Sequence, residues 1–198
     1  DPLVRPAEVE LIPENYFASL ELAKIFPQSG RLEVDLGCGD GSFVIEMAAR
    51  HPERNFVGIE KLEGRVETAC RKGARRGLRN LRVMRIETSY AIQYLLPPGS
   101  TAVVHLLFPD PWPKRKHKRR RIVTPDFLAL VHKLLAADGC LHLATDQQSY
   151  FERIRDAVAS SPFIEDPEMG EEYPPTTFEK RFVAQGLPIY RLLLRKIS

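Results

Sequence analysis

The 198-residue sequence predicts an α/β fold in which helices cover both faces of a mostly parallel sheet. Short apolar runs of strand length alternate with longer segments that are typical of helices. A glycine-rich turn, 37–41, follows the first of these runs, and a proline-rich turn, 109–113, follows the fourth. Repeated strand–helix units imply right-handed crossovers between parallel strands, so these runs are expected to form one sheet.

Each element follows from a local pattern. Buried strands are predicted where short apolar runs lie between polar segments, at 31–36, 55–60, 81–86, 102–108 and 140–145. Helices are predicted over the segments 42–50, 62–76, 89–95, 125–137 and 149–160. Thr124 and Pro125 suit the start of the fourth helix, and Asp138-Gly139 suits its end. The last apolar run, 189–197, predicts one more strand, antiparallel and at the edge of the sheet.

The chain is expected to divide into two parts of unequal size. Residues 1–30 form an amino-terminal segment that is partly helical around 16–26, and residues 31–198 form a single domain. Within this domain, 162–188 is rich in proline and acidic residues, which predicts an irregular excursion over the sheet. Long connections of this kind often carry function.

Composition argues against several classes of protein. No apolar run approaches the roughly 20 residues of a membrane helix, and no secretory signal is found, so we expect a cytoplasmic protein without membrane contact. The cysteines match no zinc spacing, so no metal site is predicted and they are expected to be reduced structural thiols, namely Cys38, Cys70 and Cys140.

The charge is unevenly distributed along the chain. The formal net charge is only +3, yet seven of the eight residues from Lys114 to Arg121 are basic, and the other is His117. Five acids lie within 165–172. A basic block in a nearly neutral domain predicts a localised site for a polyanion.

Three glycines, Gly37, Gly39 and Gly41, connect the first predicted strand to the helix that follows it. Glycines at such a turn let the backbone bend tightly and approach a ligand closely. A dinucleotide-binding fingerprint has a further glycine where this sequence has Ser42. The turn alone therefore indicates a nucleotide-like ligand without deciding which one.

Three acids lie at the predicted carboxyl ends of neighbouring strands. Asp35 precedes the glycines, Glu60 ends the second strand and Glu87 ends the third. Ligands of open parallel sheets bind at this edge, so the three carboxylates are expected to converge on one crevice. A cationic sulfonium cofactor with an ammonium group tolerates such a negative field better than a pyrophosphate does. Solvated acids at strand ends are the alternative interpretation.

A proline-rich motif begins where the fourth strand is expected to end. Pro109 and Pro111 flank Asp110 and restrict the backbone, so the carboxylate is presented in a fixed direction. Trp112 offers a flat face on which a base can stack. The motif predicts a cradle for a nucleobase, and a rigid structural turn is the alternative.

The basic run directly after this motif favours binding of nucleic-acid phosphates over a merely solvated surface. A second basic stretch lies between the second and third strands, where a solvated helix face explains it equally well. Its members are Arg71, Lys72, Arg75, Arg76, Arg79, Arg82 and Arg85.

From the first strand to about Thr145 the pattern resembles the class I S-adenosylmethionine-dependent methyltransferases. Phe-Pro-Asp-Pro-Trp followed by a basic run is similar to the hallmark of the tRNA (guanine-N7)-methyltransferase family. Two further landmarks of that family occur in order, Ala144-Thr145-Asp146 and Thr176-Thr177-Phe178-Glu179. The resemblance implies a Rossmann-like class I methyltransferase fold and methyl transfer to N7 of a guanine in the variable loop of tRNA, at position 46.

The resemblance also implies roles for individual residues. It makes Asp110 the central active-site acid, which also borders the cofactor. The other implied cofactor-binding residues are Asp35, Gly37, Gly39, Gly41, Glu60 and Glu87. The implied substrate-binding residues are Lys114, Asp146, Thr176, Thr177, Phe178 and Glu179. The implied RNA-contacting residues are Lys116, His117, Lys118, Arg119, Arg120 and Arg121.

Three positions depart from the common pattern of the family. Asp35 stands where Glu is common, Glu87 where Asp is common, and Lys116 where Arg is common. A lysine keeps the charge of an arginine but cannot bind a phosphate in a bidentate manner. The departures keep a carboxylate or a cation at each position.

The expected partners are S-adenosylmethionine as methyl donor, with S-adenosylhomocysteine as product, and tRNA as acceptor. The enzyme is expected to act as a monomer or homodimer, and no accessory subunit is implied. Three alternatives stay open at this point: a methyltransferase with another acceptor, a catalytically silent RNA-binding module, and a nucleotide-dependent oxidoreductase, which the missing glycine and the basic run disfavour.

Overall fold

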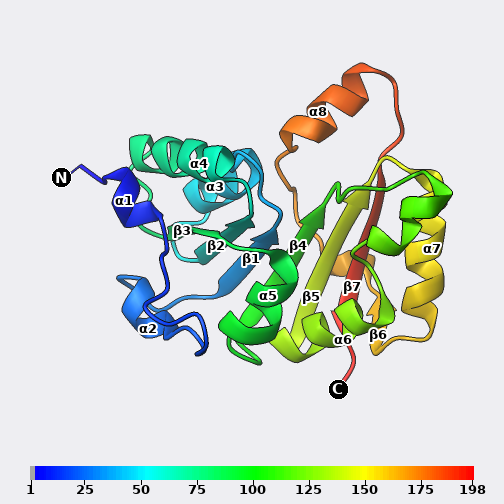
Figure 1. Cartoon of the computed structure of the whole chain (residues 1–198), viewed down its shortest axis with the longest axis horizontal. Coiled ribbons are helices and arrows are strands. Elements are labelled where there is room, and N and C mark those ends of the chain that lie inside the picture. The colour runs from blue at the N-terminus through cyan, green and yellow to red at the C-terminus, as the bar shows by residue number, and fades with distance from the viewer. Residues whose placement is uncertain (1–2) are drawn as a thin grey trace.

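The computed structural model describes residues 3–198 and contains a seven-stranded sheet with the order β3-β2-β1-β4-β5-β7-β6 (Figure 1). The first five strands of this order are parallel, and β7 is antiparallel to both of its neighbours. The strands are β1 (Leu32–Leu36), β2 (Asn55–Glu60), β3 (Leu81–Arg85), β4 (Thr101–Leu107), β5 (Leu135–Thr145), β6 (Phe163–Glu165) and β7 (Tyr190–Lys196). The predicted fold class is confirmed.

Helices pack on both faces of the sheet and create two apolar cores. On one face, α3 (Ser42–Arg50) and α4 (Glu63–Arg75) enclose one cluster of buried side chains. On the other face, α5 (Thr88–Tyr90), the π-helical turn η1 (Ala91–Leu95), α6 (Pro125–Leu134) and α7 (Gln148–Ala159) pack against the larger cluster. Nothing among the helices of residues 3–198 has the length and apolarity that crossing a membrane requires.

The start of α6 follows the sequence prediction, but its end does not. Thr124 Oγ1 accepts a hydrogen bond from the Phe127 amide at 3.1 Å, and Pro125 occupies the first helical position. The helix ends at Leu134, because Leu135 is buried and pairs with Thr101 of β4. Asp138-Gly139 therefore lies inside β5 rather than at the helix end, and the positive φ of 58° at Asp138 marks the irregular part of that strand.

Segment 162–188 contains more structure than an irregular excursion. It includes β6, the short 3-10 helix η3 (Pro167–Met169) and α8 (Thr177–Ala184). Because β6 pairs with β7, β7 is antiparallel as predicted but lies inside the sheet rather than at its edge. The three-residue strand Phe163–Glu165 is too short to give a period-2 signal in the sequence.

The amino-terminal segment contains two short helices, α1 (Pro6–Val9) and α2 (Leu22–Ile25), of which α2 lies within the region 16–26 that the sequence predicts to be partly helical. Residues 16–18 form a turn; residues 1–2 lie outside the described part of the chain. Val9 is fully buried against α4 and β3, and the Leu11 amide donates to the Val83 carbonyl at 2.8 Å. The segment thus packs on the domain.

Candidate active site

A cavity of about 1150 Å³ opens at the carboxyl ends of the parallel strands. Its walls come from the glycine-rich turn, the ends of β2 and β4, the loop after β4, and the start of α8. In Figure 1, α8 stands beyond the arrowheads of β4 and β5. Open parallel sheets bind their ligands at this edge, so this cavity is the candidate site.

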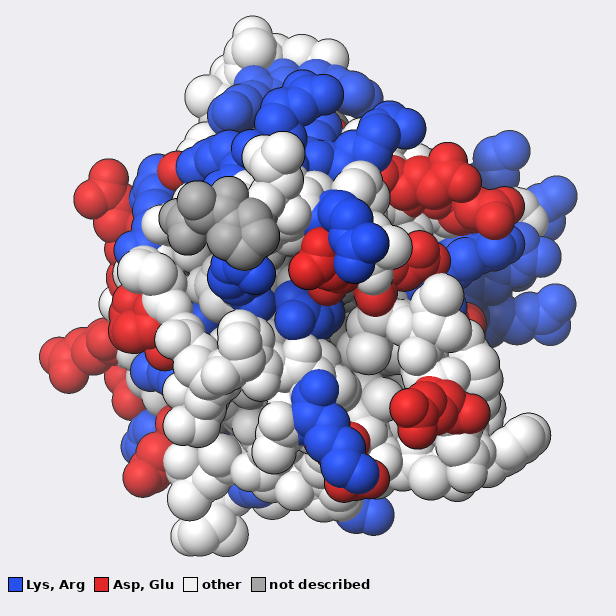
Figure 2. All heavy atoms as spheres, turned by 90° about the vertical axis from the view of Figure 1, so that its left-hand side faces the viewer, with Lys and Arg blue, Asp and Glu red and all other residues white. Residues whose placement is uncertain are grey.

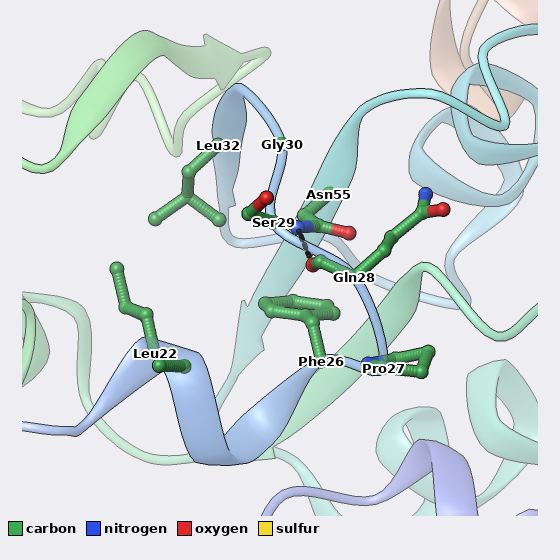
Figure 3. Close-up of a pocket in the computed structure, with 9 residues that line it drawn as sticks. Leu22, Phe26, Pro27, Gln28, Ser29, Gly30, Leu32 and Asn55 are labelled. Atoms are coloured by element: carbon green, nitrogen blue, oxygen red, sulfur yellow. Dashed lines mark hydrogen bonds between the residues drawn. The ribbon is translucent and has the colours of Figure 1, made fainter.

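A smaller cavity of about 280 Å³ lies at the opposite end of the strands (Figure 3). Leu22 and Phe26 line it from α2 and its end, and Leu32 and Asn55 line it from the starts of β1 and β2. Asn55 Nδ2 donates to the Gln28 carbonyl at 3.0 Å. None of the predicted functional residues lines this smaller cavity.

The three glycines of the turn serve two different purposes. Gly37 and Gly39 have positive φ angles of 73° and 59°, and a Cβ added at either would meet no atom within 4 Å. Both residues line the cavity, so their open sides leave room for a ligand close to the backbone. A Cβ at Gly41 would lie 2.8 Å from the Ala69 Cβ, so this glycine permits α3 to pack on α4.

Glu60 holds the glycine-rich turn in place. It is 6% exposed, and its Oε2 accepts a hydrogen bond from the Gly39 amide at 3.0 Å. Its Oε1 accepts from the amides of Lys61 and Leu62 at 2.9 and 3.0 Å. The carboxylate therefore joins the end of β2 to the turn after β1, and it also lines the cavity.

Asp35 is buried at the floor of the cavity. Burial raises the pKa of its carboxyl from 3.8 to about 7, with the nearby Glu60 carboxylate adding to the rise and His105 opposing it. A buried carboxyl of this kind gains most from a ligand that brings positive charge.

Glu87 lies two residues beyond the end of β3 rather than at the strand end itself. Its two carboxylate oxygens accept hydrogen bonds from the amides of Ser89 and Tyr90, so the side chain caps the start of α5. The residue is exposed and lines the cavity. Glu87 therefore lines the same cavity as Asp35 and Glu60, and it also caps α5.

The loop after β4 presents Asp110 at the cavity wall in a strained backbone. Phe108 and Trp112, on either side of Asp110, have positive φ angles of 52° and 41°, which bulky residues rarely adopt. Asp110 Oδ1 accepts a hydrogen bond from the Trp112 amide at 3.0 Å. Together with the flanking prolines, these features fix the direction of the carboxylate.

Trp112 also lines the cavity, but part of its ring already has neighbours. The Arg120 guanidinium lies 5.0 Å from the ring centre, and the His117 ring meets it edge-on with centroids 5.7 Å apart. A base that stacks on this face must therefore take the place of Arg120 or lie beside it.

The basic run forms the 3-10 helix η2 (Arg115–Arg120) directly beyond the Asp110 loop. Arg120 and Arg121 line the cavity, whereas Lys114 and residues 115–119 lie outside its lining. Arg121 differs from the others because it is only 8% exposed. Its Nε donates to the Pro111 carbonyl at 2.6 Å and its guanidinium lies 4.7 Å above the Tyr150 ring, so it braces the loop from inside.

The carboxyl-terminal landmarks also reach the cavity. Asp146, after β5, lines it together with Thr176, Thr177 and Phe178 at the start of α8. Thr176 Oγ1 accepts from the Glu179 amide at 2.9 Å and caps this helix. Glu179 itself lies outside the cavity lining, and its side chain pairs with Arg191 of β7 at 2.9 Å.

The structure thus gathers most of the predicted residues around one cavity, whose acidic floor lies beside a basic rim. Sequence reasoning missed other members of its lining, among them Ser42, Arg65, Phe108 and Phe182. It also missed the buried pair His105 and His142, whose Nδ1 atoms are 2.8 Å apart. A histidine in each of two neighbouring predicted strands was the available signal.

The comparisons with known proteins agree with this geometry. Residues 29–192 match the model of a family described as "Putative methyltransferase". A tRNA (guanine-N(7)-)-methyltransferase from Leifsonia xyli subsp. xyli is 38% identical over 191 residues, which cover 90% of this chain and 82% of the relative. The chain belongs to the tRNA (guanine-N(7)-)-methyltransferase family. The family predicted from the sequence motifs is confirmed.

Two more members of this family illustrate the extent of the match. The relative from Alkalilimnicola ehrlichii is 36% identical over 183 residues, which cover 89% of this chain and 77% of that protein. The relative from Thermotoga maritima is 32% identical over 195 residues, which cover 96% of this chain but only 62% of that longer protein.

Solved structures share the fold at low sequence identity. The 16S rRNA methyltransferase KamB superposes with a TM-score of 0.65 at 18% identity, covering 92% of this chain and 95% of KamB. A 16S rRNA (adenine(1408)-N(1))-methyltransferase variant from Catenulisporales acidiphilia, solved with S-adenosylmethionine, gives a TM-score of 0.61 at 18% identity, covering 89% of this chain and 90% of that one. These likenesses establish the class I methyltransferase fold.

Proposed function

We propose that this protein transfers a methyl group from S-adenosylmethionine to N7 of a guanine in the variable loop of tRNA, at position 46. The observation that carries the proposal is the placement of opposite charges around one cavity. Asp35, Glu60 and Glu87 provide a negative floor, whereas η2 provides a basic rim beside Asp110. The names of the relatives support tRNA guanine as the acceptor, and tRNA as substrate implies a cytoplasmic reaction.

The residues of the cavity fit the proposed cofactor. The open sides of Gly37 and Gly39 admit a nucleoside close to the backbone, and the buried Asp35 carboxyl favours a cationic ligand. Glu60 would face the ribose of the same ligand, and Glu87 would lie beside its adenine. S-adenosylmethionine supplies an electrophilic methyl group on a sulfonium centre. Among residues 3–198, His, Cys, Asp and Glu form no group able to hold a metal ion.

The chemistry at guanine N7 determines what Asp110 has to do. N7 carries an in-plane lone pair and no proton, so methyl transfer requires no general base. The protein has to align the acceptor with the methyl group and to accommodate the positive charge that reaches the purine. The rigid Asp110 carboxylate accepts hydrogen bonds from the guanine edge in this proposal, and its charge stabilises the cationic product.

Basic side chains on two surfaces would hold the tRNA phosphates. One surface is η2, which adjoins the cavity. The other is the outer face of α4, where Arg71 and Arg75 are exposed. Figure 2 shows Lys and Arg side chains gathered over the upper part of the face that carries α1 and α4. The two surfaces would contact different parts of an extended polyanion.

Methylation of unmodified tRNA transcripts tests the proposal. We expect one labelled nucleotide, the variable-loop guanosine, and loss of labelling when this nucleotide is replaced by 7-deazaguanosine, which has carbon in place of N7. A transcript with 7-deazaguanosine elsewhere is the control and should be labelled normally. Labelling that persists at the substituted nucleotide would contradict N7 as the acceptor, and labelling of another nucleotide would contradict the position.

The same assay with Asp110→Asn tests the role of the acid. We expect single-turnover methylation to fall by about a hundredfold or more, in line with the loss of one preorganised electrostatic contact. Calorimetry should show that S-adenosylhomocysteine binds nearly as tightly as to the wild type. If cofactor binding is lost in proportion to turnover, Asp110 serves the cofactor rather than the guanine.

A further inference from the structure

A chain of hydrogen-bonded side chains crosses the sheet beneath the cavity. Glu33 Oε2 lies 2.8 Å from His105 Nε2, and the Nδ1 atoms of His105 and His142 are 2.8 Å apart. His142 Nε2 lies 2.6 Å from Nη1 of Arg191, whose Nη2 donates to Glu179 Oε1 at 2.9 Å. The five residues belong to β1, β4, β5, β7 and α8, so the chain runs strand by strand through the sheet to that helix.

Only one arrangement of protons satisfies all four hydrogen bonds with neutral histidines. Arginine is a donor without acceptor atoms, so His142 Nε2 must accept. A neutral imidazole carries one N–H, hence His142 Nδ1 holds the proton and donates to His105 Nδ1. The proton of His105 is therefore on Nε2, from which it donates to the Glu33 carboxylate. Each link thus fixes the tautomer of the next.

The first three members of this chain are buried, and the chain has a carboxylate at each end with the Arg191 guanidinium next to the second one. Glu33, His105 and His142 are at most 1% exposed. Burial by itself raises the pKa of Glu33, but the hydrogen bond from His105, together with the charges of Arg31 and Arg54, lowers it overall. Buried polar groups are costly unless every partner is in place, so this chain specifies one orientation of the Arg191 side chain.

Helix α8, at the end of this hydrogen-bonded chain, has eight residues and buries no side chain. Besides the Glu179–Arg191 pair, its contacts with the rest of the domain include a hydrogen bond between Thr177 Oγ1 and Ser42 Oγ at 2.9 Å, and the ring of Phe182, 5.5 Å from that of Phe108. A glutamate three residues after a threonine cap often reaches back to the cap, whereas Glu179 pairs with Arg191 instead.

We propose that Arg191 is a positioning residue that holds α8 over the acceptor side of the cavity, and that the His142–His105–Glu33 chain fixes its guanidinium for this task. α8 contributes Phe178, Arg181 and Phe182 to the wall that faces the Asp110 loop. The consequence for tRNA rests on the proposed function, but the effect on α8 itself is measurable without substrate.

The same arrangement predicts that acid loosens α8. The groups that face His142 are His105 from β4, Arg191 from β7 and the Tyr173 ring, stacked at 4.1 Å; Phe43 of α3 lies farther away. Among residues 3–198 no carboxylate bonds to this imidazole, and burial together with the charge of Arg191 lowers its pKa well below 6.5. Once protonated, His142 Nε2 can no longer accept from Arg191, so the chain breaks at low pH.

Hydrogen exchange of the intact protein tests the proposal, with Arg195→Met as the matched control for Arg191→Met. Arg195 lies on the same face of β7 and pairs with Asp166 at 3.0 Å, away from α8. We expect Arg191→Met to lower the protection factors of α8 amides by about tenfold, as for a lost charge-assisted hydrogen bond, and Arg195→Met to leave them unchanged. Arg191→Lys should fall between, because one ammonium cannot reach both partners.

Kinetics and pH give two further measurements. For Arg191→Met, kcat/KM for tRNA should fall by about tenfold while the Kd of S-adenosylhomocysteine stays within about threefold. In the wild type, α8 protection should decline at acidic pH, as the pH falls through the lowered pKa of His142, after correction for intrinsic exchange rates. In His142→Gln this decline should disappear, because an amide does not titrate in that range.

The possible outcomes separate the interpretations. Unchanged α8 protection in Arg191→Met would overturn the proposal, and so would an equal loss in Arg195→Met. If Arg191→Met does not fold, Glu179→Met breaks the same ion pair from the α8 side and should give the same exchange pattern. A wild type that fails to methylate tRNA would refute the proposed function while leaving the exchange result intact.

Discussion

At the scale of single residues, the cavity combines buried acids with different electrostatic situations. Glu60 accepts three backbone hydrogen bonds, so its carboxylate is solvated by the protein. Asp35 lies close by, and burial raises its pKa to about 7. With this raised pKa, Asp35 of the folded protein takes up a proton as the pH falls through about 7. A cationic ligand reverses this preference.

Replacement of Asp35 by Asn should therefore stabilise the protein and weaken cofactor binding. Because the folded pKa is higher than the unfolded one, Asp35 stabilises the fold below pH 4 and loses that contribution as the pH rises through 7. A rise from 3.8 to about 7 corresponds to a free-energy cost of up to about 4 kcal/mol at pH 8. Urea unfolding should show Asp35→Asn to be more stable than the wild type at pH 8.

The comparison with pH 5 provides the control for this prediction. There the Asp35 side chain of the folded wild type is protonated, so the stability gain of Asp35→Asn should be much smaller than at pH 8. S-adenosylmethionine should bind the wild type more tightly as the pH rises from 6 to 8, and the variant should lack this trend. Equal stability gains at both pH values would show that Asp35 is not protonated in the folded protein.

At the scale of elements, the sequence predicts features that depend on local periodicity and capping, but it does not predict features that depend on pairing between distant strands. Except for β6 and the start of β5, the strands agree with prediction within about two residues, and so do α3, α4 and α7, because period and capping act within one segment. The predicted end of α6 was wrong because β5 begins at Leu135, which pairs with Thr101 of β4, 34 residues earlier in the sequence. The inner position of β7 likewise depends on β6, which has no pattern of its own.

The same distinction applies to the candidate site. Asp35, Glu60 and Asp110 could be found because each lies at or just beyond the carboxyl end of a strand, within a recognisable pattern. The chain from Glu33 to Glu179 could not, because its members come from five elements that only the sheet order brings together. His105 and His142 are directly opposite each other in the register of β4 and β5. That register becomes visible only in the folded structure.

The glycine-rich turn allows a test at this scale, with Gly99 as the matched position. Gly39 and Gly99 have positive φ angles of 59° and 69°, and neither has an atom within 4 Å of an added Cβ. Either alanine variant should lose about 1 kcal/mol of stability, because both place a Cβ in the left-handed region. Only Gly39→Ala should also weaken S-adenosylhomocysteine binding, by about tenfold, since only this Cβ enters the large cavity. Equal affinities in calorimetry would remove the turn from the cofactor site.

At the scale of the whole molecule, the protein separates two charge requirements that would conflict at one place. A cationic cofactor favours the acids at the strand ends, whereas a polyanion is repelled by them. The chain has 29 basic and 26 acidic residues, so its net charge of +3 attracts RNA only weakly. Placing η2 beyond the Asp110 loop concentrates positive charge where the acceptor would enter, and leaves the floor negative.

This separation predicts how salt acts on the two ligands. Each lysine or arginine that neutralises a phosphate changes the slope of log affinity against log salt by about 0.7 to 0.9. Lys116→Gln with Arg119→Gln, both exposed on η2, should therefore reduce the magnitude of the slope for tRNA by about 1.4 to 1.8, provided that both contact phosphates. Lys133→Gln serves as the control, because Lys133 is exposed near the amino ends of the strands, where its carbonyl accepts a hydrogen bond from the Gly99 amide.

Binding of S-adenosylhomocysteine should be insensitive to all three substitutions, since no phosphate is involved. A tRNA slope that stays constant in the double variant would mean that η2 does not contact the RNA backbone, and the exposed arginines of α4 would then be the surface to neutralise next.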